Sequence, residues 1–234
     1  YYGMDIYRAS GDFLVEGNTI VHGYGKSTSS GIYLRPMRGT EEARPRIINN
    51  EIAFTDAAGN VVGINVAGSS SDNNAYVRIA HNTVSISGKA TGSSAMFINQ
   101  YMTGAEVVNN ILVNNAEGYA LRVNKAEYMP ALLATNMLSA GDKFCYMAGD
   151  VADLDAWAAA TGDDSSFTAD VTFLSADILE PVDFAPLAQG SPLDYAGTDI
   201  SGVERDKATP TVGAYEATDT SAVPAPAEGF PMIS

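Results

Sequence analysis

The 234-residue sequence has one cysteine, one tryptophan, two histidines and few basic residues. Cys145 has no partner for an internal disulfide, so we expect it to be a small buried residue between Phe144 and Tyr146. Its 13 Lys and Arg stand against 28 Asp and Glu, and the formal charge of −15 excludes nonspecific nucleic-acid binding. No apolar run approaches the roughly 18 to 20 residues that span a bilayer, so we expect no membrane span in this chain.

Motifs for nucleotide binding, zinc binding and acyl transfer are absent as well. The sequence has no Gly-x-x-x-x-Gly-Lys-Ser/Thr, no His-Glu-x-x-His and no Gly-x-Ser-x-Gly, and His22 and His81 are too few for a histidine-based metal site. We therefore predict no metal and no cofactor, with calcium left open as an alternative that no specific motif supports. Five carboxylates could serve hydrolysis or calcium binding, but we interpret them as turn and cap residues: Asp163, Asp164, Asp194, Asp199 and Asp206.

What the sequence does have is apolar content and an uneven distribution of charge. Apolar residues make up 46% of it, enough for a sizeable core. Residues 1–140 hold 11 acids and 10 bases, whereas residues 141–234 hold 17 acids and 3 bases. We divide the chain into β-coils over 1–140, further coils and a cap over 141–216, and a low-complexity tail over 217–234. The start at Tyr1, without an initiator Met or a signal peptide, is interpreted as an N-terminal truncation.

An asparagine recurs at intervals of 32, 32, 28 and 26 residues. The recurring residues are Asn18, Asn50, Asn82, Asn110 and Asn136. Apolar residues within each unit alternate in steps of two and are interrupted by Gly, Asn, Ser and Thr, which predicts short strands and turns and excludes helical repeats. Each unit is then one turn of a coil. Because no turn can bury its apolar face alone, the stack of turns is the folding unit.

Aligning the units places like residues above one another at the strand spacing of about 4.8 Å. Three inward columns are predicted: Val15, Ile47, Ile79, Val107, Leu133; Ile20, Ile52, Val84, Leu112, Leu138; and Ile32, Ile64, Met96. The recurring asparagines are interpreted as a structural ladder at a tight bend, where Asn tolerates a left-handed backbone. Replacing Asn50 or Asn82 by Ala is expected to destabilise the stack by about 1 to 2 kcal/mol.

The Ile/Val-x-Asn-Asn-x-Ile and Gly-Ile-x-Leu patterns resemble the right-handed parallel β-helix repeat of the pectate-lyase-like superfamily. The segment from Phe184 to Gly197, with Arg205 and the closing Gly213-Ala214-Tyr215-Glu216, resembles the C-terminal end of secreted bacterial members. The resemblance implies an all-β, single-stranded right-handed parallel β-helix (solenoid) with a C-terminal cap. Within the cap, an acidic N-cap at Asp153 and a glycine stop at Gly162 predict one short helix.

Members of this superfamily include polysaccharide lyases, glycoside hydrolases, epimerases, tailspikes and noncatalytic surface proteins, so the resemblance leaves the activity open. It implies a secreted or cell-surface monomer that binds or cleaves an acidic polysaccharide along one face, in the manner of a lyase. The alternative is a noncatalytic surface, adhesion or stalk protein. The sequence contains no catalytic signature that decides between them.

Candidate binding residues follow from the alignment of the repeats. Arg46 and Arg78 precede aligned asparagines by four residues, so they are predicted one strand spacing apart on one outer face, where two guanidinium groups suit sugar carboxylates or sulfates. The alternative is that Glu106, in the same position of the next turn, neutralises Arg78. Tyr76 and His81 flank Arg78 as potential bases, although His81 also suits an ordinary structural hydrogen bond. The remaining candidates are loop cations: Lys26, Arg35 and Arg38.

Overall fold

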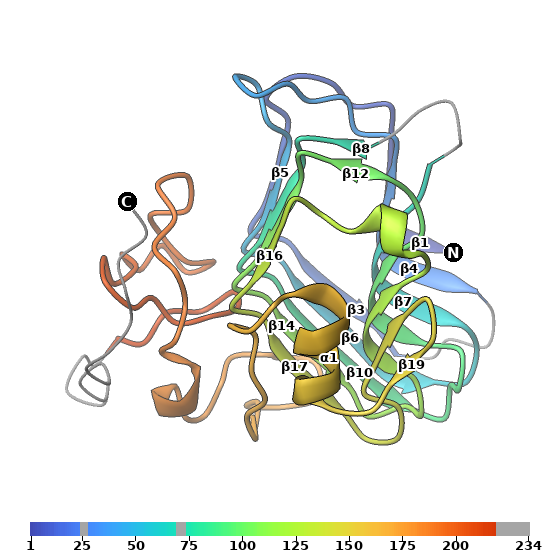
Figure 1. Ribbon diagram of the computed structural model, residues 1–234. Coiled ribbons are helices and arrows are strands. Elements are labelled where there is room, and N and C mark those ends of the chain that lie inside the picture. Colours follow the sequence, from blue (N-terminus) through green and yellow to red (C-terminus); the bar gives the residue numbers. More distant parts are fainter. Residues whose placement is uncertain (24–27, 69–73, 219–234) are drawn as a thin grey trace.

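The computed structural model describes residues 1–23, 28–68 and 74–218. They form a parallel β-solenoid of about five turns with one α-helix, which confirms the predicted fold class. Figure 1 looks roughly along the coil axis and shows three sheets that enclose the interior. Successive turns add successive strands to these three sheets.

Sheet A has seven strands, in the order β1 (Tyr2–Tyr7), β4 (Ser29–Arg35), β7 (Val61–Val66), β11 (Ser94–Ile98), β15 (Tyr119–Val123), β18 (Cys145–Met147) and β19 (Asp150–Val151). Sheet C contains β2 (Leu14–Glu16), β5 (Arg46–Ile48), β9 (Arg78–Ala80), β13 (Glu106–Val108) and β16 (Leu132–Ala134). Sheet D contains β3 (Thr19–His22), β6 (Glu51–Ala57), β10 (Thr83–Gly88), β14 (Ile111–Asn114) and β17 (Met137–Ala140). A short sheet B pairs β8 (Asn74–Ala75) with β12 (Met102–Thr103). Only β18 and β19 pair in the antiparallel sense among the described strands.

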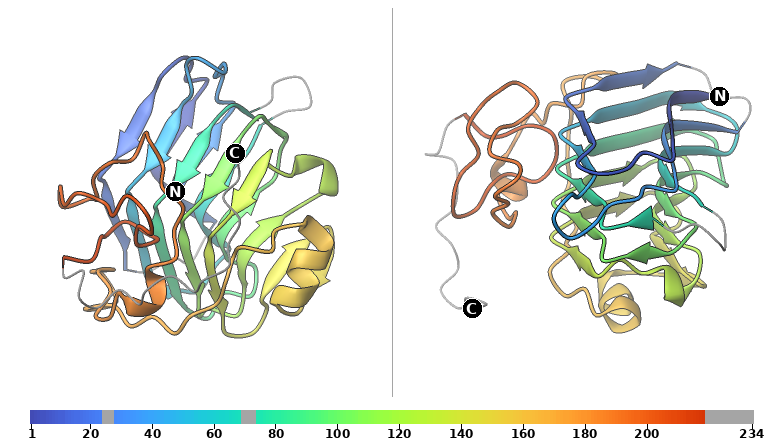
Figure 2. Two further views of the ribbon diagram at one scale, coloured as in Figure 1. Left: turned by 60° about the vertical axis from the view of Figure 1, so that its left-hand side comes forward. Right: turned by 90° about the horizontal axis from the view of Figure 1, so that it is seen from above.

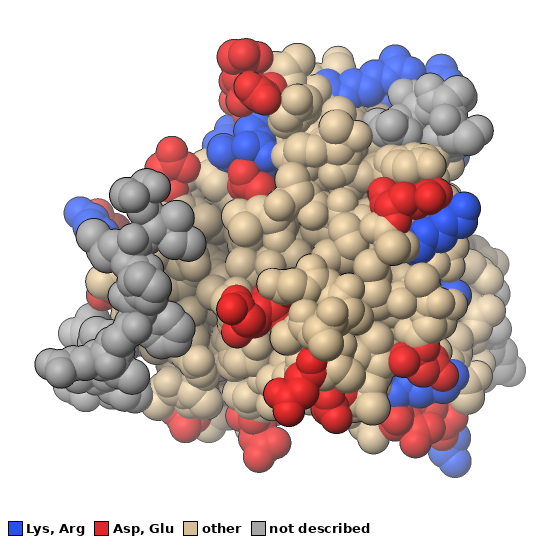
Figure 3. Space-filling model, in the orientation of Figure 1, with Lys and Arg blue, Asp and Glu red and all other residues tan. Residues whose placement is uncertain are grey.

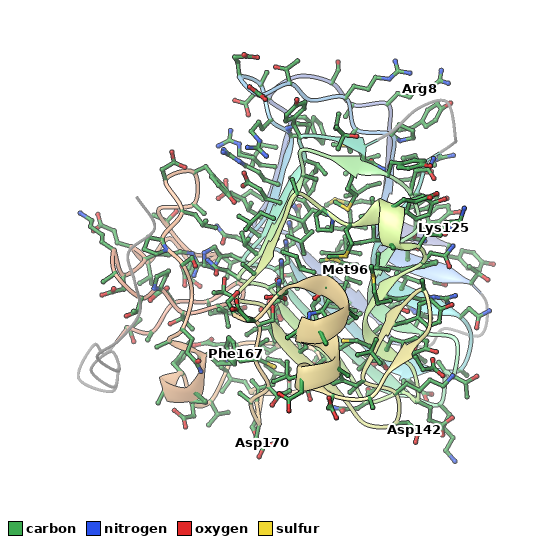
Figure 4. All side chains as sticks on the ribbon, viewed as in Figure 1. Arg8, Met96, Lys125, Asp142, Phe167 and Asp170 are labelled. Carbon is green, nitrogen blue, oxygen red and sulfur yellow. The ribbon has the colours of Figure 1, made fainter. Side chains whose placement is uncertain are left out.

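The three predicted inward columns are confirmed by the strand register. Each column consists of residues that face one another in neighbouring strands. Most of these side chains are fully buried, and Met96 lies among the sheets in Figure 4, while Arg8 and Lys125 lie at the surface. Cys145 belongs to the same core, as expected from the sequence. Stacking like on like therefore builds one continuous apolar interior.

The five recurring asparagines form a hydrogen-bonded ladder at the corner between sheets C and D. In each of the four steps, the Nδ2 of one asparagine donates to the Oδ1 of the next at 2.9 Å. In each step, the backbone N–H of the donating asparagine also donates to that Oδ1, at 3.0 to 3.1 Å. Asn136 ends the ladder, since its N–H donates to Ser166 Oγ at 3.0 Å.

The left-handed backbone at this corner belongs to the residue before each ladder asparagine, not to the asparagine itself. These preceding residues all have positive φ: Gly17, Asn49, His81, Asn109 and Thr135. The sequence-based expectation was therefore wrong by one position. The ladder asparagines keep ordinary backbone angles, because their contribution is the side-chain amide.

One end of the stack is closed by the helix α1 (Leu154–Thr161). Asp153 caps it by accepting from the N–H of Ala156 at 2.9 Å, and Gly162 stops it with φ 78°. Trp157 is fully buried and its Nε1 donates to Asp163 Oδ2 at 3.1 Å. The predicted helix thus lies over the last coil. Among the described residues, no helix is both long and apolar enough to cross a membrane.

Beyond Phe167, which pairs with Met137, the chain runs back along the corner between sheets C and D, largely as turns with one short 3-10 helix. This 3-10 helix is η2 (Ala185–Leu187). Another short 3-10 helix, η1 (Ala126–Tyr128), lies earlier in the chain, between β15 and β16. We call residues 168–216 the returning segment. Figure 2 shows it beside the coils rather than below them. Of the expected C-terminal region, residues up to Phe167 extend the stack and carry α1, and the remainder covers its side.

Apolar contacts hold the returning segment to the outer faces of sheets C and D. One cluster joins Leu187 and Val212 to Ile111, Val113 and Met137. A second cluster joins Ala196, with Leu193 and Tyr195, to Ile48, Ala80 and Val108. The outer face of sheet A lies on the other side of the coils (Figure 1).

Polar contacts explain the Gly-Ala-Tyr-Glu signature. Gly213, with φ 86°, donates its N–H to the Asn109 carbonyl at 2.7 Å, and a Cβ there would collide with Ile111 and Thr83. Tyr215 donates to Glu51 Oε2 at 2.6 Å. Glu216 is buried and pairs with Arg205 Nη1 at 3.1 Å. This closing sequence therefore fastens the returning segment across several turns of the stack, from Glu51 in the second turn to Asn109 in the fourth.

Candidate functional site

The arginine row lies where the sequence predicts it, but its charges are already paired. Arg46 is opposite Arg78, and Arg78 is opposite Glu106. Arg78 Nε contacts Glu106 Oε2 at 3.1 Å, and Arg44 Nη1 contacts Glu106 Oε1 at 2.7 Å. Arg46 Nη2 contacts Asp12 Oδ1 at 3.0 Å.

The returning segment also covers part of this row. The Tyr195 ring lies 4.0 Å from the guanidinium carbon of Arg78, and its hydroxyl donates to Glu106 at 3.1 Å. An adjacent cleft of about 190 Å³ has carboxylates as well as guanidinium groups in its lining: Asp12, Glu41, Glu42, Arg44, Arg46 and Arg78. A glycan carboxylate at this row would therefore compete with carboxylates of the protein.

His81 and Tyr76 both lie at bends with positive φ. His81 is fully buried, and its Nε2 lies 3.0 Å from Asn109 Nδ2. Burial, followed by the charge of Arg205, lowers the pKa of His81 well below its usual value. His81 is thus a neutral residue under the returning segment, without access to a polymer. Tyr76 lies instead beside Arg44, which donates to its carbonyl at 3.2 Å.

The remaining candidates lie apart from this row. Arg35 is not in a loop as expected but is the last residue of β4, on the outer face of sheet A. There it forms a two-pronged pair with Asp5 at 2.9 and 2.5 Å. Arg38 is exposed in a loop whose backbone bridges to Ser10 and Ala75. Lys26 lies outside the described residues. The structure thus brings Arg46, Arg78 and Tyr76 to one region but places Arg35 on another sheet.

A different row, missed in the sequence, crosses the outer face of sheet A. It takes one outward residue from each of six neighbouring strands, and we call it the aromatic row: Asp5, Tyr33, Asn65, Phe97, Arg122 and Tyr146. Parallel pairing places its members about 4.8 Å apart along the coil axis. In the sequence this row corresponds to the variable position of Gly-Ile-x-Leu, which lies between two inward residues and therefore faces outward.

Arg122 is the central charge of this row. Its guanidinium carbon lies 4.5 Å from the ring centre of Phe97, 5.1 Å from that of Tyr146 and 5.9 Å from that of Tyr119. No carboxylate of the described residues forms an ion pair with Arg122, and its buried Nε has no hydrogen-bond partner there. The rings hold the guanidinium by cation–π contacts and leave it without a counter-ion from the described protein.

Tyr119 is fixed beside Arg122 by its own contacts. Its hydroxyl donates to Asp150 Oδ1 at 2.5 Å, and the ammonium of Lys143 lies 5.1 Å from its ring centre. Burial, together with the bond to Asp150, raises the pKa of Tyr119 to about 12. The phenol is therefore neutral near pH 7 and acts as a rigid wall of the site.

The opposite end of the aromatic row is a stacked pair of rings. Tyr2 and Tyr33 have ring centres 4.8 Å apart and planes inclined by 11°. Arg35 lies over Tyr33 at 5.4 Å and over Tyr7 at 4.7 Å, with its charge balanced by Asp5. This end presents ring faces with a neutralised charge, whereas the Arg122 end presents an unbalanced cation.

The surface charge is not a single acidic field. The view in Figure 3, which includes the capped end, shows acidic and basic side chains in small separate groups with uncharged surface between them. No group of three or more His, Cys, Asp or Glu in the described part of the chain is placed to hold a metal ion. A local cation such as Arg122 can therefore face an anionic ligand despite the net charge.

Comparison with family models, curated proteins and solved structures gave no match to the chain.

Proposed function

We propose that this chain is an extracellular, polysaccharide-associated module of the pectate-lyase-like β-helix type, and that it binds an acidic glycan along the outer face of sheet A. The observation that carries the proposal is the aromatic row with Arg122 framed by Phe97, Tyr119 and Tyr146. Aromatic faces pack against the C–H faces of sugars, and a guanidinium fork suits a uronate carboxylate. A straight row with one side chain per strand suits an extended polymer.

Binding is favoured over cleavage by the state of the possible bases. His81 is buried, Arg46 and Arg78 are ion-paired, and Tyr119 keeps its proton near pH 7. A proton-abstracting base has to reach the sugar in a state that can accept a proton. The proposal is thus close to the alternative raised by the sequence, a noncatalytic surface or adhesion protein, but it includes a glycan-binding face.

The test is titration of the full chain with oligogalacturonate and with a neutral oligosaccharide of the same length. Arg122→Gln is expected to weaken oligogalacturonate binding at least about tenfold, or about 1.4 kcal/mol. The matched control Arg46→Gln, an outward arginine on sheet C, should change the affinity less than about twofold. Failure to bind any glycan, or a loss caused by Arg46→Gln and not by Arg122→Gln, would overturn the proposal.

Cleavage is tested with the same samples. Lyase products contain an unsaturated uronate that absorbs in the ultraviolet, and we expect no such absorbance to develop. Appearance of that product with the full chain would refute the noncatalytic part of the proposal while leaving glycan recognition in place.

A further inference from the structure

The two ends of the solenoid differ. At one end, α1 and the buried Trp157 close the interior, and Phe167 pairs with the last strand of sheet D. At the other end, β1, β2 and β3 are the terminal strands of sheets A, C and D, and no described strand pairs with their outer edges. Three edges in one plane thus expose unpaired backbone groups, a known hazard for aggregation. We call this the open end.

Apolar surface is concentrated at the open end. It contains a depression of about 480 Å³ lined by Met4, Asp5, Ile6, Phe13, Leu14, Val15, Glu16 and Asn18. Ten large apolar side chains are exposed in the described part of the chain, and six of them belong to the first turn. These six are Tyr1, Tyr2, Tyr7, Phe13, Leu14 and Val21. Met4 and Ile6 continue the inward columns of sheet A, so the depression is the uncovered end of the core.

The asparagine ladder is also incomplete at this end. In every later rung, Oδ1 accepts two hydrogen bonds, from the backbone N–H and the Nδ2 of the asparagine before it. Asn18 donates to Asn50 in this way, but no donor among the described residues reaches Asn18 Oδ1. An acceptor in the ladder register therefore faces outward beside the exposed core.

We propose that the open end binds one further β-coil of the same type, whose strands run parallel to β1, β2 and β3 and whose corner carries an asparagine. Such a coil supplies what the open end lacks: partners for three edges, apolar side chains for the depression, and an amide that donates to Asn18. The proposal does not depend on glycan binding.

A second copy of this chain fits less well. Two open ends related by a twofold axis would pair their strands in the antiparallel sense. They would also bring the acceptor ends of two ladders together, so that neither Asn18 Oδ1 gains a donor. The chemistry of the corner thus favours a parallel coil.

The chain contains a suitable probe. Tyr2 aligns with Ser30, and Ser29 aligns with Val61, so residues 29–60 make one complete turn that would lead into Tyr1. Fusing a copy of residues 29–60 directly ahead of Tyr1 places a copied Asn50 over Asn18. The controls are a scrambled 32-residue extension and the fusion with the copied Asn50 changed to Ala.

Hydrogen exchange gives the readout. In the unmodified chain, amides of β1, β2 and β3 should exchange at least about tenfold faster than those of β6, β7 and β9. The fusion should slow exchange in β1, β2 and β3 at least about tenfold, and the scrambled extension should not. The copied Asn50→Ala should lose most of the protection at Asn18.

Three results would overturn the proposal. The first is equal protection of the first and second turns in the unmodified chain, which needs no fusion protein. The second is a folded fusion that leaves exchange in β1, β2 and β3 unchanged. The third is a dimer of the unmodified chain, detected by native mass spectrometry, whose formation protects the same strands; that result would make a second copy the occupant.

Discussion

Replacing Asn82 by alanine removes an interior rung of the asparagine ladder. Its Nδ2 donates to the carbonyls of Ile47 and Ala80 at 2.9 and 3.1 Å and to Asn110 Oδ1 at 2.9 Å. Its Oδ1 accepts from the N–H and Nδ2 of Asn50 at 3.1 and 2.9 Å. The site is fully buried, so water does not replace these partners.

The two N–H groups of the Asn82 amide share three acceptors, so about four hydrogen bonds are lost. At about 1 kcal/mol each, and with buried groups left unpaired, the loss should lower the free energy of unfolding by about 3 to 5 kcal/mol. This exceeds the about 1 to 2 kcal/mol expected from the sequence, since the sequence did not show how many partners one amide has. Urea unfolding followed by far-ultraviolet circular dichroism measures the loss.

Asn18→Ala is the matched control. Within the described ranges, Asn18 Nδ2 donates to the Glu16 carbonyl at 3.1 Å and to Asn50 Oδ1 at 2.9 Å and to no other group, at a partly buried position. We expect a cost of about 1 kcal/mol or less, because water can replace part of what is lost. Equal losses at Asn18 and Asn82 would refute the ladder argument. So would an Asn82→Ala variant that loses glycan affinity but keeps its stability.

Two further changes test the attachment of the returning segment. Arg205→Met leaves the buried Glu216 without its cation and should lower the free energy of unfolding in urea by about 3 to 5 kcal/mol. The double variant with Glu216→Gln should recover part of this loss. The control Lys207→Met, at an exposed position, should not change the stability. Equal stability of the single and double variants would contradict the pairing. Burial and the charge of Arg205 lower the pKa of His81 below its ordinary 6.5 in the folded chain. As the pH falls, His81 is therefore protonated in the unfolded chain at a higher pH than in the folded chain. The free energy of unfolding should therefore decrease below about pH 6.5, by up to about 1.4 kcal/mol per pH unit. His81→Asn should reduce this slope, and an unchanged slope would exclude His81 as its source.

The interior of the solenoid was predictable because like residues recur where like residues stack. Ile20, Ile52 and Val84 share a column and a spacing that only a coil of constant register explains. The same alignment predicted that Arg46 and Arg78 are neighbours. A repeat fixes which residues of successive turns lie together, so sequence spacing is sufficient for contacts of this kind.

The surroundings of those neighbours were not predictable in the same way. Tyr195 covers Arg78 from a segment outside the repeat, and Arg44 reaches Glu106 from a loop. Such contacts join distant parts of the chain and have no period. The aromatic row was missed for a related reason: an outward position tolerates Tyr, Asn, Phe or Arg, so its members share a place in the sheet but no residue type.

The returning segment changes how the stack can come apart. In a simple solenoid each turn contacts only its neighbours, so turns can fray one by one from either end. Here Phe167 is held at the last turn, while Arg205 and Tyr215 bond to Asn49 and Glu51 of the second turn. Separating any interior pair of turns must also detach this segment. We therefore expect the coils to come apart in a single cooperative transition rather than in a series of local openings.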